Sequence, residues 1–279
     1  MFVHLNTHSV YSPMRGLLSL PDLMNLSRSH GMDTLALTDV NGMWGFIRFV
    51  QHCKDARIHP ITGTNLITEN DDVILLAENQ YGYENMCRAV SAVHDDPNQS
   101  MADILERRLA GLFVLAHKES TLKKLIKIIP DTHLFIELRP GVQESLMHQL
   151  AKKLKLEMVV TGDVYFRSQS DHDAHVTLRA IENNTTLEQL NISECKTDQH
   201  WFRNEAEMVK LFPNSLDALN NSRYLADRCK KDWSFINTIF PGLSLKETHI
   251  SNKKLKDKVY TGARIRYGEV DETIRQRIE

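Results

Sequence analysis

Short runs of aliphatic and β-branched residues alternate along the first 165 residues with segments of helical periodicity. Six such runs are evident after an apolar opening at Phe2, and they cover 34–39, 60–67, 73–77, 112–117, 134–139 and 157–163. Repeated strand-then-helix order with mostly short links is typical of a parallel sheet. Six or seven such units favour a closed βα barrel over separate domains, with an open doubly wound sheet as the alternative.

The helical segments carry start signals, stop signals and apolar stripes. The stretch Ser19-Leu20-Pro21-Asp22 has the arrangement of a capping box, and Gly31 follows as a stop. Residues 45–56 place apolar side chains at i, i+3 and i+4 spacing. The spacing predicts helices over 19–31 and 45–56.

The last third of the chain is predicted to be mostly helical. Pro213 precedes a helical stretch over 216–229, and 251–268 has Leu255, Val259 and Ile265 near helical spacing. Asp271 begins another helix, for which no stop signal precedes Glu279. We therefore expect the sequence to end inside an element.

Composition narrows the class of protein. The formal net charge of −2 lacks the basic excess that drives nonspecific nucleic-acid binding, so any such contact must be local or come from another domain. The four cysteines lie far apart without a C-x-x-C pair, which argues against a zinc ribbon or a disulfide scaffold. No leader pattern and no run of membrane-spanning length is evident, so a cytoplasmic protein without a membrane role is expected.

Polar residues stand where the predicted strands end, which is where parallel sheets bind ligands. These residues are His8, Asp39, Asn65, His117, Arg139 and Asp163. Converging imidazoles and carboxylates suit zinc, manganese or iron. Ordinary capping and turn roles for the same residues are the alternative.

Four ordered blocks carry a family resemblance: "FVHLNTHSVYS", "GMDTLALTDVNGMWGF", "LLAENQYGYENMCRAVS" and "VVTGDVYFRSQSDHDAHVTLRAI". They resemble the polymerase-and-histidinol-phosphatase (PHP) domain that begins the alpha subunit of bacterial DNA polymerase III. The resemblance implies an α/β fold, a distorted (β/α)7 barrel of the PHP type over 1–200. It also implies a helical extension over 201–279 that leads toward a polymerase palm, whose carboxylate motif is absent from this sequence.

Metal-binding members of that family share ligand motifs that are depleted here. The corresponding positions are Asn6, His8, Arg15, Asp39, Val40, Asn65, Lys118, Asp163 and Tyr165, with His94 and His117 as further candidates. Histidine is expected at Asn6, Val40 and Tyr165. An acid is expected at Arg15 and Asn65. A cysteine is expected at Lys118, unless a one-residue shift aligns His117 there instead.

The surviving ligands are too few for the centre of a multinuclear phosphoesterase. His8, Asp39 and Asp163 would hold at most a single divalent ion (Zn, Mn or Mg), and loss of most ligands should abolish hydrolysis. We expect no cofactor and no catalytic residue, although the resembled full-length protein is a DNA-directed DNA polymerase, a nucleotidyltransferase.

The function expected from the resemblance is a degenerate, metal-free domain that serves as a structural and partner-binding module in DNA replication. The expected partners are polymerase domains of the same protein and a proofreading exonuclease subunit, with DNA contacted only through the full-length protein. The alternatives are a metal-dependent phosphoesterase or 3′–5′ exonuclease with an unorthodox site, and a free-standing adaptor.

A site without metal leaves acidic residues that need protons or a positive partner. One hypothesis is that Arg15 reaches Asp39 or Asp163; the alternative is that Arg15 points to solvent. The lysines of "ESTLKKLIKIIP" are expected to form a solvated helix face, with DNA contact as the less favoured interpretation.

Overall fold

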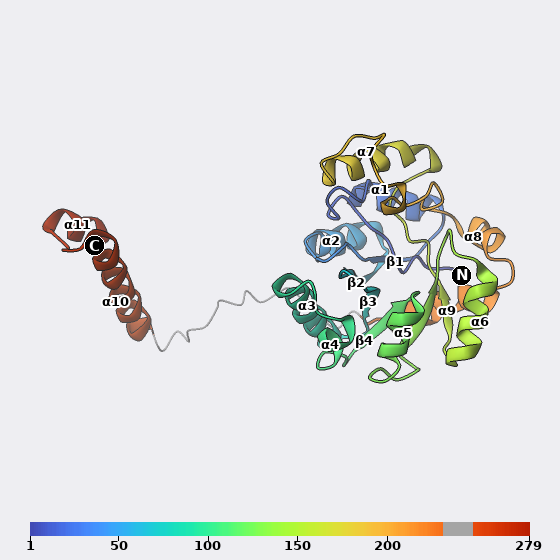
Figure 1. Ribbon diagram of the computed structural model, residues 1–279, viewed down its shortest axis with the longest axis horizontal. Helices are drawn as coiled ribbons and strands as arrows, with labels where there is room; N and C mark the ends of the chain where they lie inside the picture. Colours follow the sequence, from blue (N-terminus) through green and yellow to red (C-terminus); the bar gives the residue numbers. More distant parts are fainter. Residues whose placement is uncertain (231–247) are drawn as a thin grey trace. The chain divides into compact units, whose positions relative to one another are not determined.

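The computed structural model describes residues 1–230 and 248–279 (Figure 1). The chain divides into two compact units, Met1–Trp233 and Ser234–Glu279. All six apolar runs expected to be strands are strands, all in the first unit. They are β1 (Thr34–Leu37), β2 (His59–Ile67), β3 (Asp72–Ala77), β4 (Leu112–Ala116), β5 (Leu134–Leu138) and β6 (Met158–Val160).

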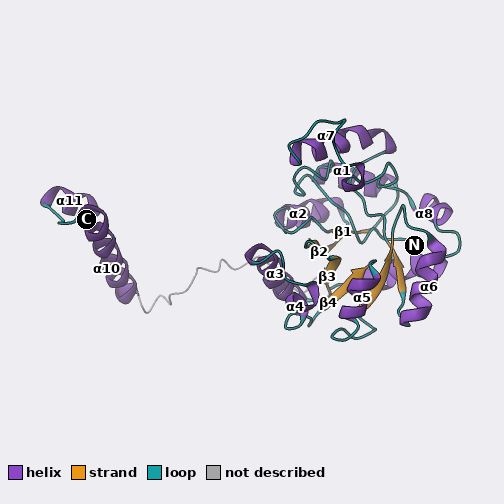
Figure 2. Ribbon diagram, viewed as in Figure 1, coloured by secondary structure: helices purple, strands orange, loops and turns teal. Residues whose placement is uncertain are grey.

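Helices follow or separate these strands and lie outside the sheet (Figure 2). In the first unit they are α1 (Leu20–Ser29), α2 (Phe46–Ala56), α3 (Gln80–Asp95), α4 (Met101–Leu105), α5 (Glu119–Leu125), α6 (Glu144–Leu154), α7 (His172–Glu182), α8 (Glu205–Leu211) and α9 (Leu216–Arg228). Two 3₁₀ turns span Gln169–Asp171 and Ile192–Glu194. The second unit holds α10 (Thr248–Tyr267) and α11 (Glu272–Ile278). The capping box expected at Ser19 is present. The Ser19 side chain accepts a hydrogen bond from Asp22 N, and the Asp22 side chain accepts one from Ser19 N.

The six strands form one sheet in sequence order, but its strands are not all parallel. β1 and β2 pair in parallel, and β5 pairs in parallel with both β4 and β6. β3 is antiparallel to its two neighbours, β2 and β4. The expectation of a wholly parallel sheet was therefore wrong at β3. The physical reason is the short turn after Ile67, where Thr68 N donates to Asp71 O at 2.9 Å. A connection this short can join only antiparallel strands.

The N-terminal segment 4–8 bonds on two sides. On one side Ala36 N and Thr38 N donate to the carbonyls of His4 and Thr7, at 3.0 and 2.8 Å. On the other side His8 N donates to Val164 O at 2.8 Å, and Val164 N donates to Asn6 O at 3.1 Å. The segment thus connects β1 to the chain that follows β6.

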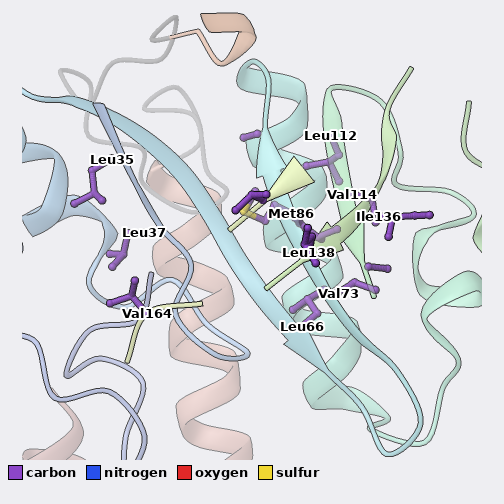
Figure 3. Close-up of a cluster of buried hydrophobic side chains, with 14 of the residues drawn as sticks. Leu35, Leu37, Leu66, Val73, Met86, Leu112, Val114, Ile136, Leu138 and Val164 are labelled. Atoms are coloured by element: carbon purple, nitrogen blue, oxygen red, sulfur yellow. The ribbon is translucent and has the colours of Figure 1, made fainter. Parts of the chain in front are cut away.

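Alternate residues of the strands enter two separate apolar clusters. Leu35 and Leu37 of β1 belong to the larger cluster, between the sheet and its helices (Figure 3), whereas Ala36 faces a smaller one with Ile74 and Phe113. Side chains on a strand point to opposite faces in turn, so both faces of this sheet are buried. This explains why the strands read as continuous apolar runs.

α9 covers one end of the smaller cluster. Leu225, Ala226 and Cys229 belong to that cluster, and the Ser222 hydroxyl accepts a 3.0 Å hydrogen bond from Val3 N. α8 and α9 therefore belong to the compact unit that contains the sheet, which spans Met1–Trp233.

Candidate functional site

Buried polar side chains gather at the edge of the sheet where five of its strands end. Asp39 follows β1, Asn65 lies near the end of β2, and Asp163 follows β6. Because β3 runs in the opposite direction, its first residue, Asp72, lies at this same edge, where Asn65 Nδ2 donates to Asp72 Oδ1 at 2.7 Å. The reversed strand thus adds a carboxylate that the ends of parallel strands would not supply.

Asp163 is the centre of this cluster. Its carboxylate is fully buried, and the Lys196 ammonium donates to Oδ2 at 2.6 Å. Arg139 Nη1 lies 3.5 Å and His200 Nδ1 3.2 Å from the same oxygen. Burial alone would raise the pKa of Asp163, but the nearby charges of Lys196 and Arg139 and the bond from His200 hold that pKa well below its usual range. The carboxylate is therefore charged and held by cations from the protein itself.

Arg139 joins three carboxylates. Its Nη1 lies 3.3 Å from Asp72 Oδ2, 3.5 Å from Asp163 Oδ2 and 3.9 Å from Glu137 Oε2. Burial opposes the charge of Arg139, but these three carboxylates raise its pKa above the ordinary value. A guanidinium placed among three acids occupies the position of a shared counterion.

Glu137 is buried inside β5, and one of its carboxylate oxygens accepts two hydrogen bonds. Its Oε1 accepts from Asn6 Nδ2 at 2.9 Å and from Thr161 Oγ1 at 2.7 Å. Burial favours a raised pKa for Glu137, but His117 and Arg139 lower it. His117 also lies beside Arg139, with 3.0 Å between its Nε2 and Arg139 Nη2. Because the guanidinium can only donate, that imidazole nitrogen accepts.

His8 and Tyr165 line the cluster as a stacked pair. Their ring centroids are 3.9 Å apart, and His8 Nε2 lies 3.3 Å from Asn65 Oδ1. Burial lowers the pKa of His8 to about 4, which keeps the ring neutral at pH 7. Tyr165 replaces an expected ligand with a phenol whose pKa burial raises well above its usual range.

Asp39 belongs to a separate hydrogen-bonded turn. Its Oδ1 accepts from Ser9 N at 2.8 Å and from Ser12 Oγ at 2.7 Å, and Ser9 Oγ lies 2.9 Å from Oδ2. No cation pairs with Asp39 among the described residues, and burial raises its pKa. Val40 N donates to the same Ser12 hydroxyl. These hydrogen bonds fix the loop 9–16, which follows the segment 4–8.

Arg15 does not contact either aspartate. Its guanidinium pairs with Glu182 Oε1 at 3.3 Å, and the described residues give it no ion pair with Asp39 or Asp163. The hypothesis that Arg15 supplies the counter-charge was therefore wrong. The loop 9–16 bonds back to Asp39, and this directs the Arg15 side chain toward Glu182 of α7. The counter-charge itself is present, from Arg139 and Lys196.

Two other expected positions lie away from the cluster. The ammonium of Lys118 donates to Asn70 O at 3.1 Å, and His94 Nε2 lies 2.7 Å from Asn41 O on an exposed helix end. Of the two residues considered for the lost cysteine position, His117 is the one at the site.

The side chains of the cluster do not fit a metal ion. Within residues 1–230 and 248–279, no three His, Cys, Asp or Glu side chains are arranged to hold one. Oδ2 of Asp163 already contacts Lys196 and Arg139. A divalent ion there would meet two fixed positive charges at close range.

Four residues of the cluster were not singled out as site residues from the sequence: Asp72, Glu137, Lys196 and His200. A charged residue in the apolar run "LFIELR" was a usable signal for Glu137. Lys196 and His200 lie in an irregular segment after α7, where no local pattern marks them.

Comparison with known proteins identifies the class. Residues 4–129 match the PHP domain, so the chain carries a domain of this family. It is also homologous to alpha subunits of bacterial DNA polymerase III. It is 30% identical over 266 residues to the DNA polymerase III subunit alpha of Pseudomonas fluorescens, covering 83% of this chain and 23% of that protein. The alignment to the Escherichia coli K12 subunit alpha is also 30% identical, over 82% of this chain and 23% of that protein.

An error-prone DNA polymerase from Symbiobacterium thermophilum aligns with the whole chain at 27% identity, over 30% of its own length. The chain thus spans about a quarter of the length of these relatives.

Solved structures are more distant. An amidohydrolase from Chromobacterium violaceum has a TM-score of 0.42 at 12% identity, over 59% of this chain and 88% of that one. A two-domain protein from Bacteroides vulgatus also has a TM-score of 0.42, at 15% identity, over 67% of this chain and 56% of that one. These values are too low to assign an activity. No described helix is long and apolar enough to cross a membrane.

Proposed function

We propose that this chain is the PHP domain of a protein of the DNA polymerase III alpha type and that it acts in DNA replication without a metal ion, as a structural and partner-binding module. The observation that carries the proposal is the pair of cations on Asp163, with Lys196 at 2.6 Å and Arg139 at 3.5 Å. Both occupy the space around the carboxylate that a hydrolytic metal centre would need.

Charge balance supports the same conclusion. Two permanent cations, Arg139 and Lys196, face the three carboxylates Asp72, Glu137 and Asp163. The remaining polar atoms of Asn6 and His117 also face these groups. His117 Nδ1 is an exception, because it has no hydrogen-bond partner among the described residues and lies 3.7 Å from Glu137 Oε2. A buried network whose charges are already balanced gains little from a metal and loses its internal ion pairs if one enters.

A closed barrel is part of the proposal. The segment 4–8 would act as the seventh strand, since it bonds to β1 on one side and to Val164 on the other. The proposed partners are the polymerase domains of the same protein and a proofreading exonuclease subunit, in the cytoplasm. The relatives' greater length supports the first of these.

The decisive experiment measures metal content and activity together. The protein is purified without chelator, and zinc, manganese and iron are measured by mass spectrometry. Hydrolysis of p-nitrophenyl phosphate and of single-stranded DNA is then followed with added Mn²⁺, Zn²⁺ or Mg²⁺. We expect well below one metal ion per chain and no turnover.

A matched variant identifies contamination. Turnover that persists unchanged in Asp163→Ala comes from another protein, whereas turnover that disappears in Asp163→Ala supports a metal-dependent phosphoesterase or exonuclease and overturns the proposal. The melting temperature gives an independent measurement, since a bound ion would raise it. We expect the same value in EDTA and in 1 mM MnCl₂.

A further inference from the structure

Positive charge is concentrated at the C-terminal end of the described chain. Residues 248–279 contain eight Lys and Arg against five Asp and Glu, whereas residues 1–230 contain 24 against 29. The near-neutral total therefore conceals an acidic part and a basic part. Asymmetry of this kind indicates a local surface for a polyanion.

Most of this charge lies on α10. The helix carries Lys253, Lys254, Lys256, Lys258, Arg264 and Arg266, with Asp257 as its one acid, and all six basic side chains are exposed. Among the described residues only Lys256 has an ion-pair partner, Glu279 at 3.4 Å. The other five cations are free to meet an external anion.

The lysines of α5 and α6 differ in this respect. Lys123 and Lys153 both pair with Glu119, at 2.8 and 2.6 Å, and Lys124 lies 3.9 Å from Asp71. Their charge is largely satisfied within the fold, which favours the solvated-face interpretation of that stretch. The two lysine-rich surfaces therefore differ in available charge, although their sequences look alike.

The cations of α10 lie on more than one side of the helix. Val259 and Ala263 line, with Ile274 and Ile278 of α11, a hollow of about 600 Å³. Arg266 borders this apolar hollow beside α11, and Lys256 lines a second hollow with Val259. Lys253, Lys254, Lys258 and Arg264 lie on the side away from Val259 and Ala263 and form the basic side of α10. Lys254 and Lys258 are four residues apart and so project from one side of the helix. The basic side from Lys253 to Arg264 extends along about 17 Å of helix at 1.5 Å per residue, the length of about five base pairs of duplex DNA.

We propose that the basic side of α10 binds the phosphate backbone of duplex DNA, without sequence preference. The choice of DNA among polyanions rests on the proposed function in DNA replication. The distribution of charge on α10 is independent of that proposed function. Lysine and arginine on an exposed helix contact phosphates and release counterions, and this kind of contact reads no bases. DNA contact would then come in part from within this chain, contrary to the expectation that only the remaining domains supply it.

The test uses the whole 279-residue chain and a fluorescent 20-base-pair duplex, with affinity measured by anisotropy from 25 to 200 mM NaCl. We compare the wild type with Lys254→Glu/Lys258→Glu. The matched control, Lys127→Glu/Lys152→Glu, makes the same change in net charge at exposed lysines of the first unit. Each phosphate neutralised contributes about −0.9 to the slope of log K against log salt.

We expect the α10 variant to bind at least about tenfold more weakly at 50 mM NaCl and to have a slope smaller in magnitude by about 2, one phosphate per lysine. The control should change affinity by less than about twofold. Equal losses in the two variants, or no measurable binding by the wild type at 25 mM NaCl, would overturn the proposal.

One further probe excludes an anionic membrane surface, and a separate measurement distinguishes this inference from the proposed function. Tighter binding to vesicles containing phosphatidylserine than to the duplex would mean a membrane-surface helix and would also overturn the proposal. Metal content and hydrolysis are measured separately, so a metal-loaded enzyme that still binds DNA through α10 would refute the proposed function and leave this inference intact.

Discussion

The ammonium of Lys196 lies 2.6 Å from Oδ2 of Asp163, although 33 residues separate them in sequence. Lys196 is itself fixed from several sides. Its backbone N–H donates to His175 Nε2 at 3.1 Å, and its carbonyl lies 3.0 Å from His172 Nε2. The irregular segment after α7 thus delivers one cation to a buried carboxylate at the edge of the sheet.

Replacing Lys196 with methionine should destabilise the fold. Removing one partner of a fully buried pair costs about 3–5 kcal/mol, and we expect about 1–3 kcal/mol here because Arg139 still faces Asp163 and Lys196 is partly exposed. Urea denaturation measures the loss. The control Lys153→Met breaks an exposed pair with Glu119 and should cost less than about 1 kcal/mol. Equal losses in the two variants would contradict a structural role for Lys196.

Arg139 should matter more than Arg15. Arg139→Met would leave Asp72, Glu137 and Asp163 facing one another without their shared cation, so its cost should exceed that of Arg15→Met by about 2 kcal/mol. Arg15 pairs with Glu182 at the surface, where such pairs contribute less than about 1 kcal/mol. Chemical denaturation of both variants checks the order. Adding Asp72→Asn to Arg139→Met should recover part of the loss, and no recovery would argue against charge repulsion as the cause.

Stability should fall as the pH is lowered from 6.5 toward 5. Burial lowers the pKa of His4, His8 and His175 to about 4, below the value of about 6.5 in an unfolded chain. Between these values the unfolded chain binds more protons, so the stabilisation is complete above pH 6.5 and is lost as the pH falls toward 4.

The low pKa of Asp163 gives stability of the same sign, which is lost only below about pH 4. The raised pKa of Asp39 acts in the opposite direction and above that pH, because between about 3.9, the value in an unfolded chain, and its raised value the folded chain binds the extra proton. Urea midpoints at pH 7 and pH 5 should therefore differ, and His8→Asn should reduce the difference. Identical midpoints at the two pH values would contradict the neutral buried histidines.

Two glycines should respond to alanine with opposite signs. A Cβ at Gly82 would lie 1.8 Å from the carbonyl oxygen of Gly111, so Gly82→Ala should cost about 1–3 kcal/mol, as in other overpacked sites. At Gly262, inside α10, no atom lies within 4 Å, and Gly262→Ala should stabilise that helix by about 0.5–1 kcal/mol. Thermal unfolding followed by circular dichroism measures both. A stabilised Gly82→Ala variant would mean that α3 does not pack against Gly111 as described.

The six strands and the first helix could be predicted because their signals are local. Ser19 and Asp22 form their capping box within four residues, and the run "VILLA" is apolar because both of its faces are buried. The site could be predicted only in part. His8, Asn65 and Asp163 converge as the strand ends suggested, but Arg15 points away, and Arg139 and Lys196 supply the counter-charge expected of it.

The sequence by itself determined where the strands lie, which positions lack family ligands and how basic charge is distributed. Each of these depends on residue type and local spacing. The reversal of β3 follows from the short link after Ile67 and not from its apolar pattern, whereas tertiary structure alone decided that Lys196 is the counterion of Asp163. An apolar run has the same pattern in either direction, so its hydrophobicity does not encode its direction. Ion pairing depends on the path that brings distant segments to the same edge of the sheet, and that path is fixed by the packing of the whole unit.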